Sequence, residues 1–265
     1  MKLLIVPFTV VMLTINLAWS QKTDEGRVIK ILSFNIYHGA TTKGNFDLDI
    51  IAKIIIDTDP DLVALQEVDF KTNRAKKFDL TIELGWRSKM VPLFGKAMDF
   101  DGGEYGEGVL SKYSFLHTRN VVLPYSLGNE PRVALEISVL LKSGDTVSFV
   151  GTHLDHLKKE VDRLSQAKEI NDVFTKNKFP TILAGDMNAI PGSKTINILE
   201  EFWKSSYDKK DPKPTYPSNN PSRKIDYVML YPKNRWKVIA TEVIQDSIAS
   251  DHCAYLVTVM LLDEE

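Results

Sequence analysis

The stretch VIKILSFNIYHGATTKGNFDLDIIAKIIIDTDPDLVALQEVD, residues 28–69, contains a strand, a helix and a second strand in succession. An alternating, β-rich run from position 28 ends on Asn35. Asp47 stands where a helix cap is expected, and the helical pattern after it has one apolar face, made of the isoleucines at positions 50, 51, 54 and 55. A second apolar run, from position 62, leads into Glu67. This order of elements predicts an α/β layer.

The rest of the chain adds mainly strands. Apolar or alternating runs predict strands at residues 108–110, 133–141, 147–150, 182–184, 227–230, 238–243 and 255–262. Apolar residues at helical spacing predict a helix over residues 158–176. Several strands are joined by short turns, so they predict a pair of mixed sheets rather than one all-parallel sheet.

The composition is that of a globular protein. The 265 residues are 43% hydrophobic with a formal net charge of −2, which fits one large α/β domain or two small ones. No repeat or flexible linker divides the chain, so we expect a single domain over residues 21–265. The least regular stretch, KKDPKPTYPSNNPSRK at residues 209–224, is expected to be a solvated surface loop, with the rim of a binding site as the alternative.

Residues 1–20 have the features of a secretory signal peptide. Lys2 precedes a nearly uninterrupted apolar run, and Ala18 and Ser20 stand at cleavage spacing. A retained membrane anchor is the alternative, but polar residues interrupt the run and no basic stop follows it. We therefore expect an exported protein, periplasmic or secreted, with no transmembrane domain after cleavage and a monomeric state. An exported chain whose single cysteine is Cys253 forms no internal disulfide, and the apolar residues after Cys253 predict a buried structural thiol.

The apolar runs end or break at acidic, amide or histidine side chains. These are Asn35, Glu67, His153 with Asp155, Asp186 with Asn188, Asp226, and Asp251 with His252. Each alone is also explained as a turn residue or a cap. Together they fit the strand ends at which α/β folds place ligands. The other histidines, His38, His117 and His156, are expected to be surface or loop residues.

This oxygen-rich set favours a hard divalent cation, Mg²⁺ or Mn²⁺, over a structural zinc ion, which would need cysteine and more histidine. We expect Glu67 to be the metal ligand, alone or with Asp251. For phosphoester hydrolysis, Asp186 is expected to orient or deprotonate water, while Asn188 holds the phosphate or the site geometry. Asp226 is expected to fix one tautomer of the catalytic imidazole and support its charged form. His252 is expected to be that imidazole. Arg132 and His153 are expected to donate hydrogen bonds to the phosphate.

In order along the chain, these segments resemble the endonuclease/exonuclease/phosphatase superfamily, the metal-dependent phosphoesterases similar to deoxyribonuclease I and exonuclease III. The resemblance covers about residues 28–262, through SFNI, LQEVD, EYGEGVLSK, EPRVALE, GTHLDH, LAGDMNAIPGS, KIDYVML and SDH. It implies a four-layer α/β/β/α sandwich, in which two mixed sheets pack face to face with helices outside. It also implies a phosphoester substrate.

The resemblance implies a role at each matched position. Asn35 and Glu67 would lie next to the metal, with Glu67 as the direct ligand and Asp251 on the metal side. The roles implied for the others are water activation by Asp186, phosphate contact by Asn188, pairing of Asp226 with His252, and binding of the scissile phosphate by His153. Arg132, within EPR, matches a pattern of one bacterial branch.

The sequence departs from the family pattern at two places. Many members have an asparagine at the position of Glu107, so a salt partner or a changed substrate contact is expected there. The stretch FGKAMDFDGGEYG, residues 94–106, resembles exported or uncharacterised bacterial members. Its charged residues, Lys96, Asp99 and Asp101, are expected to be loop residues only.

The sequence leaves the substrate open among nucleic acid, a lipid phosphodiester of the sphingomyelin kind, and sugar or inositol phosphates. Loss of residues 1–20 removes one lysine and no acid, which leaves 32 basic and 35 acidic residues. A net charge of −3 does not favour nucleic acid, so a small or lipid-linked phosphoester is preferred. The alternative of another class is a secreted module that binds a phosphate ligand without chemistry, against which the complete set of acids argues.

Overall fold

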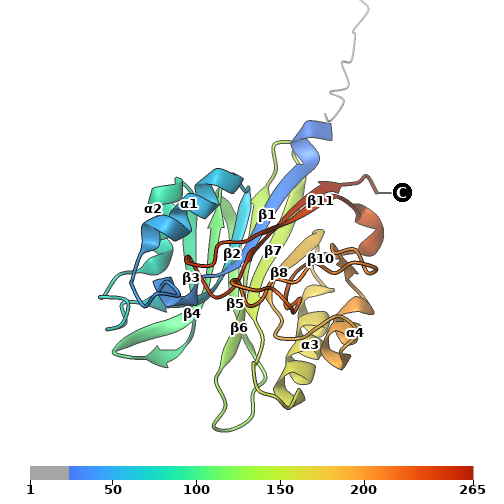
Figure 1. The fold of residues 1–265 in the computed structure, drawn as a ribbon. Coiled ribbons are helices and arrows are strands. Elements are labelled where there is room, and N and C mark those ends of the chain that lie inside the picture. Colours follow the sequence, from blue (N-terminus) through green and yellow to red (C-terminus); the bar gives the residue numbers. More distant parts are fainter. Residues whose placement is uncertain (1–23, 265) are drawn as a thin grey trace, which may run out of the picture.

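The computed structural model describes residues 24–264, and the signal peptide predicted for residues 1–20 lies outside them. Twelve strands of the described chain form two six-stranded sheets (Figure 1). The first sheet contains, in spatial order, β11 (Trp236–Ile244), β12 (Ala254–Leu261), β1 (Val28–Asn35), β2 (Leu62–Phe70), β4 (Gly103–Ser111) and β3 (Val91–Phe100). The second contains β5 (Phe115–Leu123), β6 (Arg132–Leu140), β7 (Thr146–His153), β8 (Thr181–Asp186), β10 (Asp226–Tyr231) and β9 (Lys204–Ser205).

Both sheets are mixed, as the sequence predicts. β1 and β2 run parallel in the first sheet, and β7 and β8 run parallel in the second. The other pairs between the described strands are antiparallel. A parallel pair needs a crossover, and these are made by α1 (Leu48–Thr58) and α3 (Val161–Phe174).

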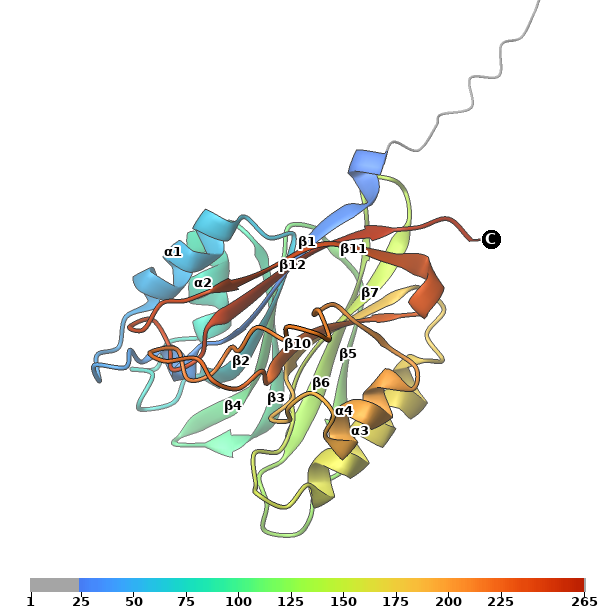
Figure 2. The same cartoon turned by 45° about the vertical axis from the view of Figure 1, so that its right-hand side comes forward.

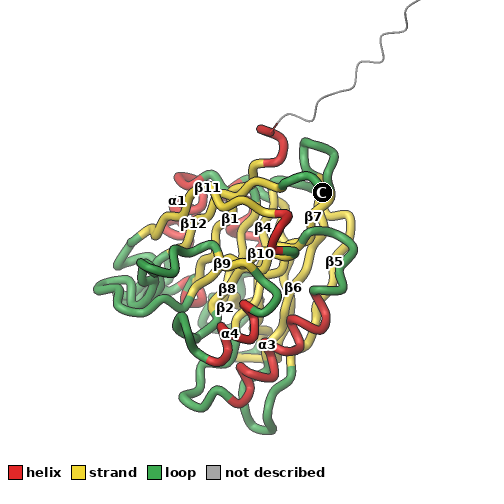
Figure 3. The backbone as a smooth tube through the Cα atoms, turned by 90° about the vertical axis from the view of Figure 1, so that its right-hand side faces the viewer, coloured by secondary structure: helices red, strands yellow, loops and turns green. Residues whose placement is uncertain are grey.

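Helices cover the outer face of each sheet, which confirms the four-layer sandwich (Figures 1 and 2). α1 and α2 (Leu80–Ser88) pack on the first sheet through buried apolar side chains such as Ile51. α3 and α4 (Lys194–Glu200) pack on the second sheet in the same way, and Figure 3 looks onto these two helices. A third apolar cluster, which includes Phe149, fills the space between the sheets.

Local sequence accounts for the helix ends. The carboxylate of Asp47 accepts the N–H groups of Asp49 and Ile50, at 3.0 and 3.4 Å, so the predicted cap of α1 is confirmed. α3 is shorter than the predicted helix over residues 158–176. Arg163 holds the carbonyls of Asp155 and Leu157, at 2.7 and 2.6 Å, and this fixes the preceding residues as a loop.

Several elements were not predicted, namely the helices α2 and α4 and the strands β3, β5 and β9. β3 and β5 are edge strands with many half-exposed residues, so they lack a clear apolar pattern. β4 extends well before the predicted residues 108–110, and a Cβ on Gly106 would lie 2.0 Å from the carbonyl oxygen of Gly95 on β3. Three short 3₁₀ helices complete the described elements: η1 (Asp24–Arg27), η2 (Tyr37–Gly39) and η3 (Lys233–Arg235). None of the helices in residues 24–264 combines the length and apolar character needed to cross a membrane.

Candidate active site

The polar strand ends meet at one edge of the two sheets. The parallel strands β1, β2, β7 and β8 finish at this edge, and the antiparallel strands β6, β10 and β12 begin there. In the strand register, Asp186 lies opposite both His153 and Asp226. A pocket of about 470 Å³ opens here, and the predicted residues that line it are Glu67, Arg132, His153, Asp186, Asn188, Asp251 and His252.

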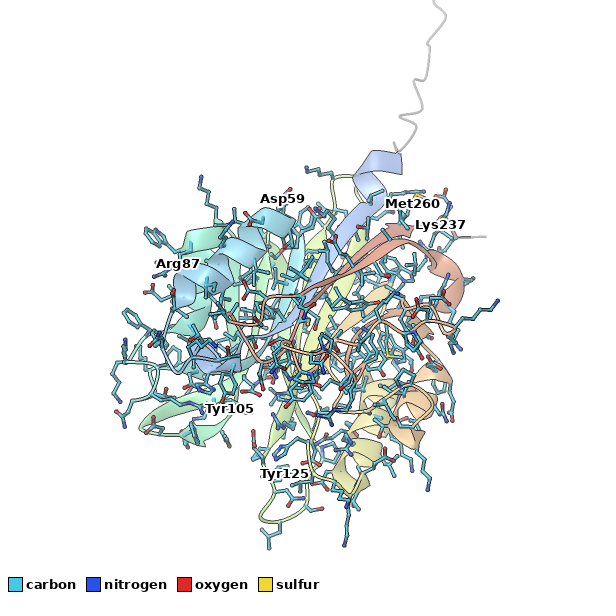
Figure 4. All side chains as sticks on the ribbon, viewed as in Figure 1. Asp59, Arg87, Tyr105, Tyr125, Lys237 and Met260 are labelled. Carbon is cyan, nitrogen blue, oxygen red and sulfur yellow. The ribbon has the colours of Figure 1, made fainter. Side chains whose placement is uncertain are left out.

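Asn35 and Asp226 lie directly behind this lining, whereas Asp155, also named at a strand end, accepts the backbone N–H of Leu157 at 3.0 Å and does not line the pocket. Asn35 contacts Glu67, and Asp226 contacts His252. Tyr105, which also lines the pocket, lies at the lower end of the first sheet in Figure 4, far from Asp59 at the opposite end. The nine residues selected from the sequence therefore form one connected site.

Glu67 enters the pocket from an irregular point of β2. The register of β2 against β4 shifts between Leu65 and Val68, and Glu67 has a φ of 57°, which is unusual for a residue with a side chain. Burial opposes the ionisation of Glu67, but His38, whose Nδ1 lies 3.7 Å from Oε2, and the hydrogen bond from Asn35 outweigh it and lower the pKa of Glu67 to about 2. Glu67 is therefore an ionised carboxylate held in a fixed orientation.

The donor set at this side of the pocket fits a hard cation. Glu67 and Asp251 line the same pocket, and neither forms an ion pair with a lysine or arginine of the described chain. Burial raises the pKa of Asp251, and the nearby charge of Glu67 raises it further. Two neighbouring carboxylates without a cationic side chain are the oxygen ligands that Mg²⁺ or Mn²⁺ prefers.

Asn35 has a different role from the one expected. Its Oδ1 accepts the backbone N–H of Tyr37 at 3.1 Å, so its Nδ2 points toward the acids and donates to Glu67 Oε1 at 3.1 Å. This orientation makes Asn35 a group that orients Glu67 and gives no support to the prediction that it is itself a metal ligand.

Asp226 and His252 form the predicted carboxylate–imidazole pair. Nδ1 of His252 lies 3.1 and 3.2 Å from the two carboxylate oxygens of Asp226, which is fully buried. Burial lowers the pKa of His252, but Asp226 and Asp186 raise it more strongly, to about 10. Ligand atoms of these three residues lie within 4.8 Å of one another. Because a protonated imidazole has no free lone pair, we interpret them as an acid–imidazolium cluster rather than a metal site.

Asp186 is held rigidly at the end of β8. Its Oδ1 accepts the backbone N–H of Asn188 at 2.8 Å, and Asn188 adopts a left-handed φ of 47°. Position 185, directly before Asp186, must be glycine, because a Cβ there would lie 1.9 Å from the carbonyl oxygen of Thr152. β7 and β8 therefore approach each other closely at the point where Asp186 enters the pocket.

The second oxygen of Asp186 is available to a ligand. Oδ2 is surrounded by nitrogen atoms at 3.4 to 3.6 Å, those of Asn35, His153 and His252. These distances are longer than ordinary hydrogen bonds, so Oδ2 retains capacity to accept a proton from water. Burial raises the pKa of Asp186 to about 7, and the charge of Asp226 adds to this effect. A carboxylate with such a pKa suits a general base near neutral pH.

Arg132 fixes the tautomer of His153. Nη1 of the buried Arg132 lies 3.0 Å from Nδ1 of His153. A guanidinium group only donates, so Nδ1 must accept and the ring proton of His153 must be on Nε2. Burial, followed by the charge of Arg132, also holds the pKa of His153 well below its ordinary value. His153 is therefore a neutral imidazole that presents an N–H to the pocket.

Two N–H groups converge beside Asp186. Nε2 of His153 lies 2.9 Å from Nδ2 of Asn188, which already donates to the carbonyl of Leu154 at 3.0 Å. These two N–H groups cannot donate to each other. Exchanging the oxygen and nitrogen positions of the Asn188 amide would instead place its oxygen against the carbonyl oxygen of Leu154, and both are acceptors. An acceptor oxygen within reach of both, such as a phosphate oxygen, would satisfy the arrangement.

The structure also shows pocket residues that the sequence did not reveal. They are Arg74, Met98, Phe100, Tyr105, Glu130, His156, Tyr216, Arg223 and Ile225. Tyr216 and Arg223 belong to the stretch 209–224, so the alternative interpretation of this stretch, as the rim of a binding site, holds for these two residues. His156, set aside as a loop residue, lies 3.3 Å from Arg132. Most of these residues were signalled only by their polar or aromatic character, and Met98 and Ile225 by nothing in the sequence.

The departures from the family pattern fall into two groups. Lys96 pairs with Asp99 at 2.7 Å on the β3–β4 hairpin, away from the pocket lining, although both residues lie in a strand rather than the expected loop. Asp101 accepts the backbone N–H of Arg74 at 2.7 Å. Glu107 is buried between the sheets near Arg132, and burial raises its pKa well above the ordinary value.

Comparison with known proteins agrees with this geometry. The model of the Endonuclease/Exonuclease/phosphatase family matches residues 32–252. An uncharacterized protein of Caenorhabditis elegans is 27% identical over 164 residues, 59% of this chain and 46% of that protein, so the chain spans about half the length of this relative.

Solved structures share the fold. An endonuclease/exonuclease/phosphatase from Beutenbergia cavernae DSM 12333 has a TM-score of 0.75 at 23% identity, over 89% of this chain and 72% of that one. A mannosyl-6-phosphatase of Bacteroides thetaiotaomicron VPI-5482 has a TM-score of 0.70 at 16% identity, over 88% of this chain and 100% of that one. With most of the sequence matched by the family model and the four-layer sandwich in place, the chain belongs to the Endonuclease/Exonuclease/phosphatase family.

Proposed function

We propose that this protein is a phosphoesterase dependent on Mg²⁺ or Mn²⁺ that hydrolyses a small phosphoester by in-line attack of water. Family members act as metal-dependent phosphoesterases, which supports the reaction class. The observation that carries the proposal is the convergence of the N–H groups of His153 and Asn188, 2.9 Å apart, beside the available oxygen of Asp186. This arrangement offers donors for a phosphate oxygen next to a base for water.

Each side chain then has a distinct task. Asp186 accepts the proton of the attacking water through Oδ2 and is kept in place by the backbone of Asn188. His153 and Asn188 donate to a nonbridging oxygen of the phosphate. His252, protonated and oriented by Asp226, donates to a second phosphate oxygen and counters the charge that develops there.

Glu67 and Asp251 would hold the cation, with Asn35 orienting Glu67. When bound, such an ion supplies positive charge at the phosphate and at the leaving oxygen. Arg132 contributes indirectly, because its hydrogen bond keeps the proton of His153 on the nitrogen that faces the substrate.

A small substrate is favoured by the shape and charge of the molecule. The pocket of about 470 Å³ suits a compact ligand, and the net charge of −2 offers no general attraction to nucleic acid. A protein of similar fold bears the name mannosyl-6-phosphatase, which is a precedent for a sugar phosphate. We further propose that residues 21–265 are a single domain, exported as a monomer after cleavage of residues 1–20.

The test is a panel of substrates and metals. Glucose 6-phosphate, inositol phosphates, sphingomyelin, plasmid DNA, RNA and a chromogenic phosphodiester are each incubated with Mg²⁺, Mn²⁺, Ca²⁺ or chelator. We expect turnover of at least one small phosphoester with Mg²⁺ or Mn²⁺ and none with chelator. Nicking of plasmid DNA as the sole activity would identify a nuclease instead.

A binding module without chemistry is distinguished by the same panel. Binding of a phosphate ligand without turnover under any metal would contradict the proposal. Secretion is tested separately, by N-terminal sequencing of the protein recovered outside the cytoplasm, and a mature terminus near residue 21 is expected.

A further inference from the structure

The mouth of the pocket contains two arginines stacked on aromatic rings. The guanidinium carbon of Arg74 lies 4.5 Å from the ring centre of Phe100, and that of Arg223 lies 4.7 Å from the ring centre of Tyr216. All four residues line the pocket, but they come from two separate regions, one near the β3–β4 hairpin and the other in residues 209–224. Such stacking restrains a guanidinium while leaving its N–H edge free.

The arginines of the pocket differ in how their charge is compensated. Arg74 makes a bidentate pair with the buried carboxylate of Asp69, at 2.7 and 2.8 Å. Arg132 lies 3.3 Å from a carboxylate oxygen of Glu130. Arg223 is exposed and has no carboxylate within ion-pair distance among residues 24–264. Its N–H groups are therefore open to an anion from outside the protein.

Tyr216 connects this free cation to the catalytic residues. The ring centre of Tyr216 lies 4.7 Å from that of His252 and 4.7 Å from the guanidinium carbon of Arg223. The guanidinium carbon of Arg223 therefore lies at most twice 4.7 Å from the ring centre of His252. An anion on Arg223 and a phosphate beside His252 can consequently belong to one small molecule.

We propose that Arg223, supported by Tyr216, is a binding site for a second anionic group of the substrate, a phosphate or carboxylate. This inference rests on the proposed phosphoesterase function and narrows its substrate class to small bis-anionic phosphoesters. The proposal is based on the guanidinium of Arg223, which has no carboxylate partner among residues 24–264, and on its short distance from the ring of His252.

The same observations argue against two other substrates. A cationic headgroup such as choline would meet the uncompensated guanidinium of Arg223 at the mouth of the pocket. A nucleic acid needs several cations along its backbone, whereas the other two pocket arginines already face carboxylates. A single uncompensated arginine matches a single additional anionic group.

The experiment compares three ligands with one carbon skeleton. Glucose 6-phosphate has no second anion, 6-phosphogluconate adds a carboxylate, and glucose 1,6-bisphosphate adds a phosphate. Binding is measured by calorimetry with Mg²⁺ on the full mature chain carrying Asp186→Asn, which prevents turnover. We expect at least one bis-anionic ligand to bind about tenfold more tightly than glucose 6-phosphate, since charge-assisted hydrogen bonds are among the stronger ones. The ligand that gains shows which anion the site prefers.

Arg223→Gln, added to that protein, should abolish the gain, and Arg223→Lys should retain part of it. The matched control is Lys213→Gln in the same stretch, because Lys213 is exposed, pairs with Asp211 at 2.6 Å and does not line this pocket. It should leave the gain intact.

Several results would overturn the inference. They are equal binding of the three ligands, no binding of any of them, or a gain that survives Arg223→Gln. A short single-stranded oligonucleotide is included, and a loss confined to its binding would assign Arg223 to nucleic acid instead. These outcomes are separate from the proposed function, because turnover in the substrate panel uses the unsubstituted catalytic residues and does not depend on Arg223.

Discussion

The floor and the rim of the pocket are built in different ways. The floor residues, Asp186, Asp226 and His252, are buried and sit at or beside the ends of central strands, where the register places Asp186 opposite Asp226. The rim residues, such as Phe100 and Arg223, come from an edge hairpin and an irregular loop and are half-buried or exposed. This contrast indicates that the floor determines the chemistry and the rim determines which molecule reaches it. Changes to the floor should therefore reduce turnover, and changes to the rim should alter substrate affinity.

The largest effect is expected from Asp186→Asn on the floor. The amide keeps the shape but cannot take a proton from water, so kcat should fall by about 10³-fold. Turnover of the best substrate with Mg²⁺ and thermal unfolding are measured together. Asp211→Asn, an exposed acid outside the pocket, is the control and should change neither. Retained turnover in Asp186→Asn would remove this residue from the mechanism.

Arg132→Gln should reduce kcat by about 10²-fold, because His153 loses the donor that fixes its tautomer. The pKa of His153, now held well below its ordinary value first by burial and then by the charge of Arg132, should rise when that charge is removed. Activity should then gain a dependence on acidic pH that the wild type lacks. A pH–rate profile of wild type and variant tests this, and two superimposable profile shapes would argue that Arg132 acts only through packing.

The acid–imidazolium cluster should make stability depend on pH. The pKa of His252 is raised from 6.5 to about 10, so between these values the folded protein keeps a proton that the unfolded chain releases. The stabilisation is complete below pH 6.5 and is lost as the pH rises through 10, at about 1.4 kcal/mol per pH unit. Urea unfolding of wild type and His252→Gln in chelator measures it. The difference in unfolding free energy should shrink with rising pH, and a constant difference would contradict the assignment.

The smallest effect is expected at the rim. Phe100→Ala removes the ring beneath the guanidinium of Arg74, so KM should rise by about threefold while kcat stays unchanged. Steady-state kinetics separate the two constants. Leu116→Ala, an exposed apolar side chain on β5, is the control. A fall in kcat for Phe100→Ala would show that floor and rim are not separable.

The elements that could be predicted from the sequence are mainly those that build the floor of the pocket, and those that build the rim were mostly missed. Buried central strands have clear apolar runs, so β1, β2, β7 and β8 and the polar residues at their ends could be located from the sequence. Edge strands β3 and β5 could not, because their residues are half-exposed and their pairing partners define them. Arg223 could be placed only within the irregular stretch 209–224, as a solvated loop or the rim of a binding site, since nothing in its neighbourhood in sequence shows whether its charge is paired.

The sequence by itself determined the family, the mixed sheets and the set of acids, amides and histidines, because each depends on local pattern and residue type. The tertiary structure decided how these groups act on one another. It turned the amide of Asn35 toward Glu67, placed the proton of His153 on Nε2 through Arg132, and stacked Arg223 on Tyr216 without a carboxylate partner among the described residues. Such properties depend on distances between atoms that are remote along the chain, and only packing of the two sheets sets those distances.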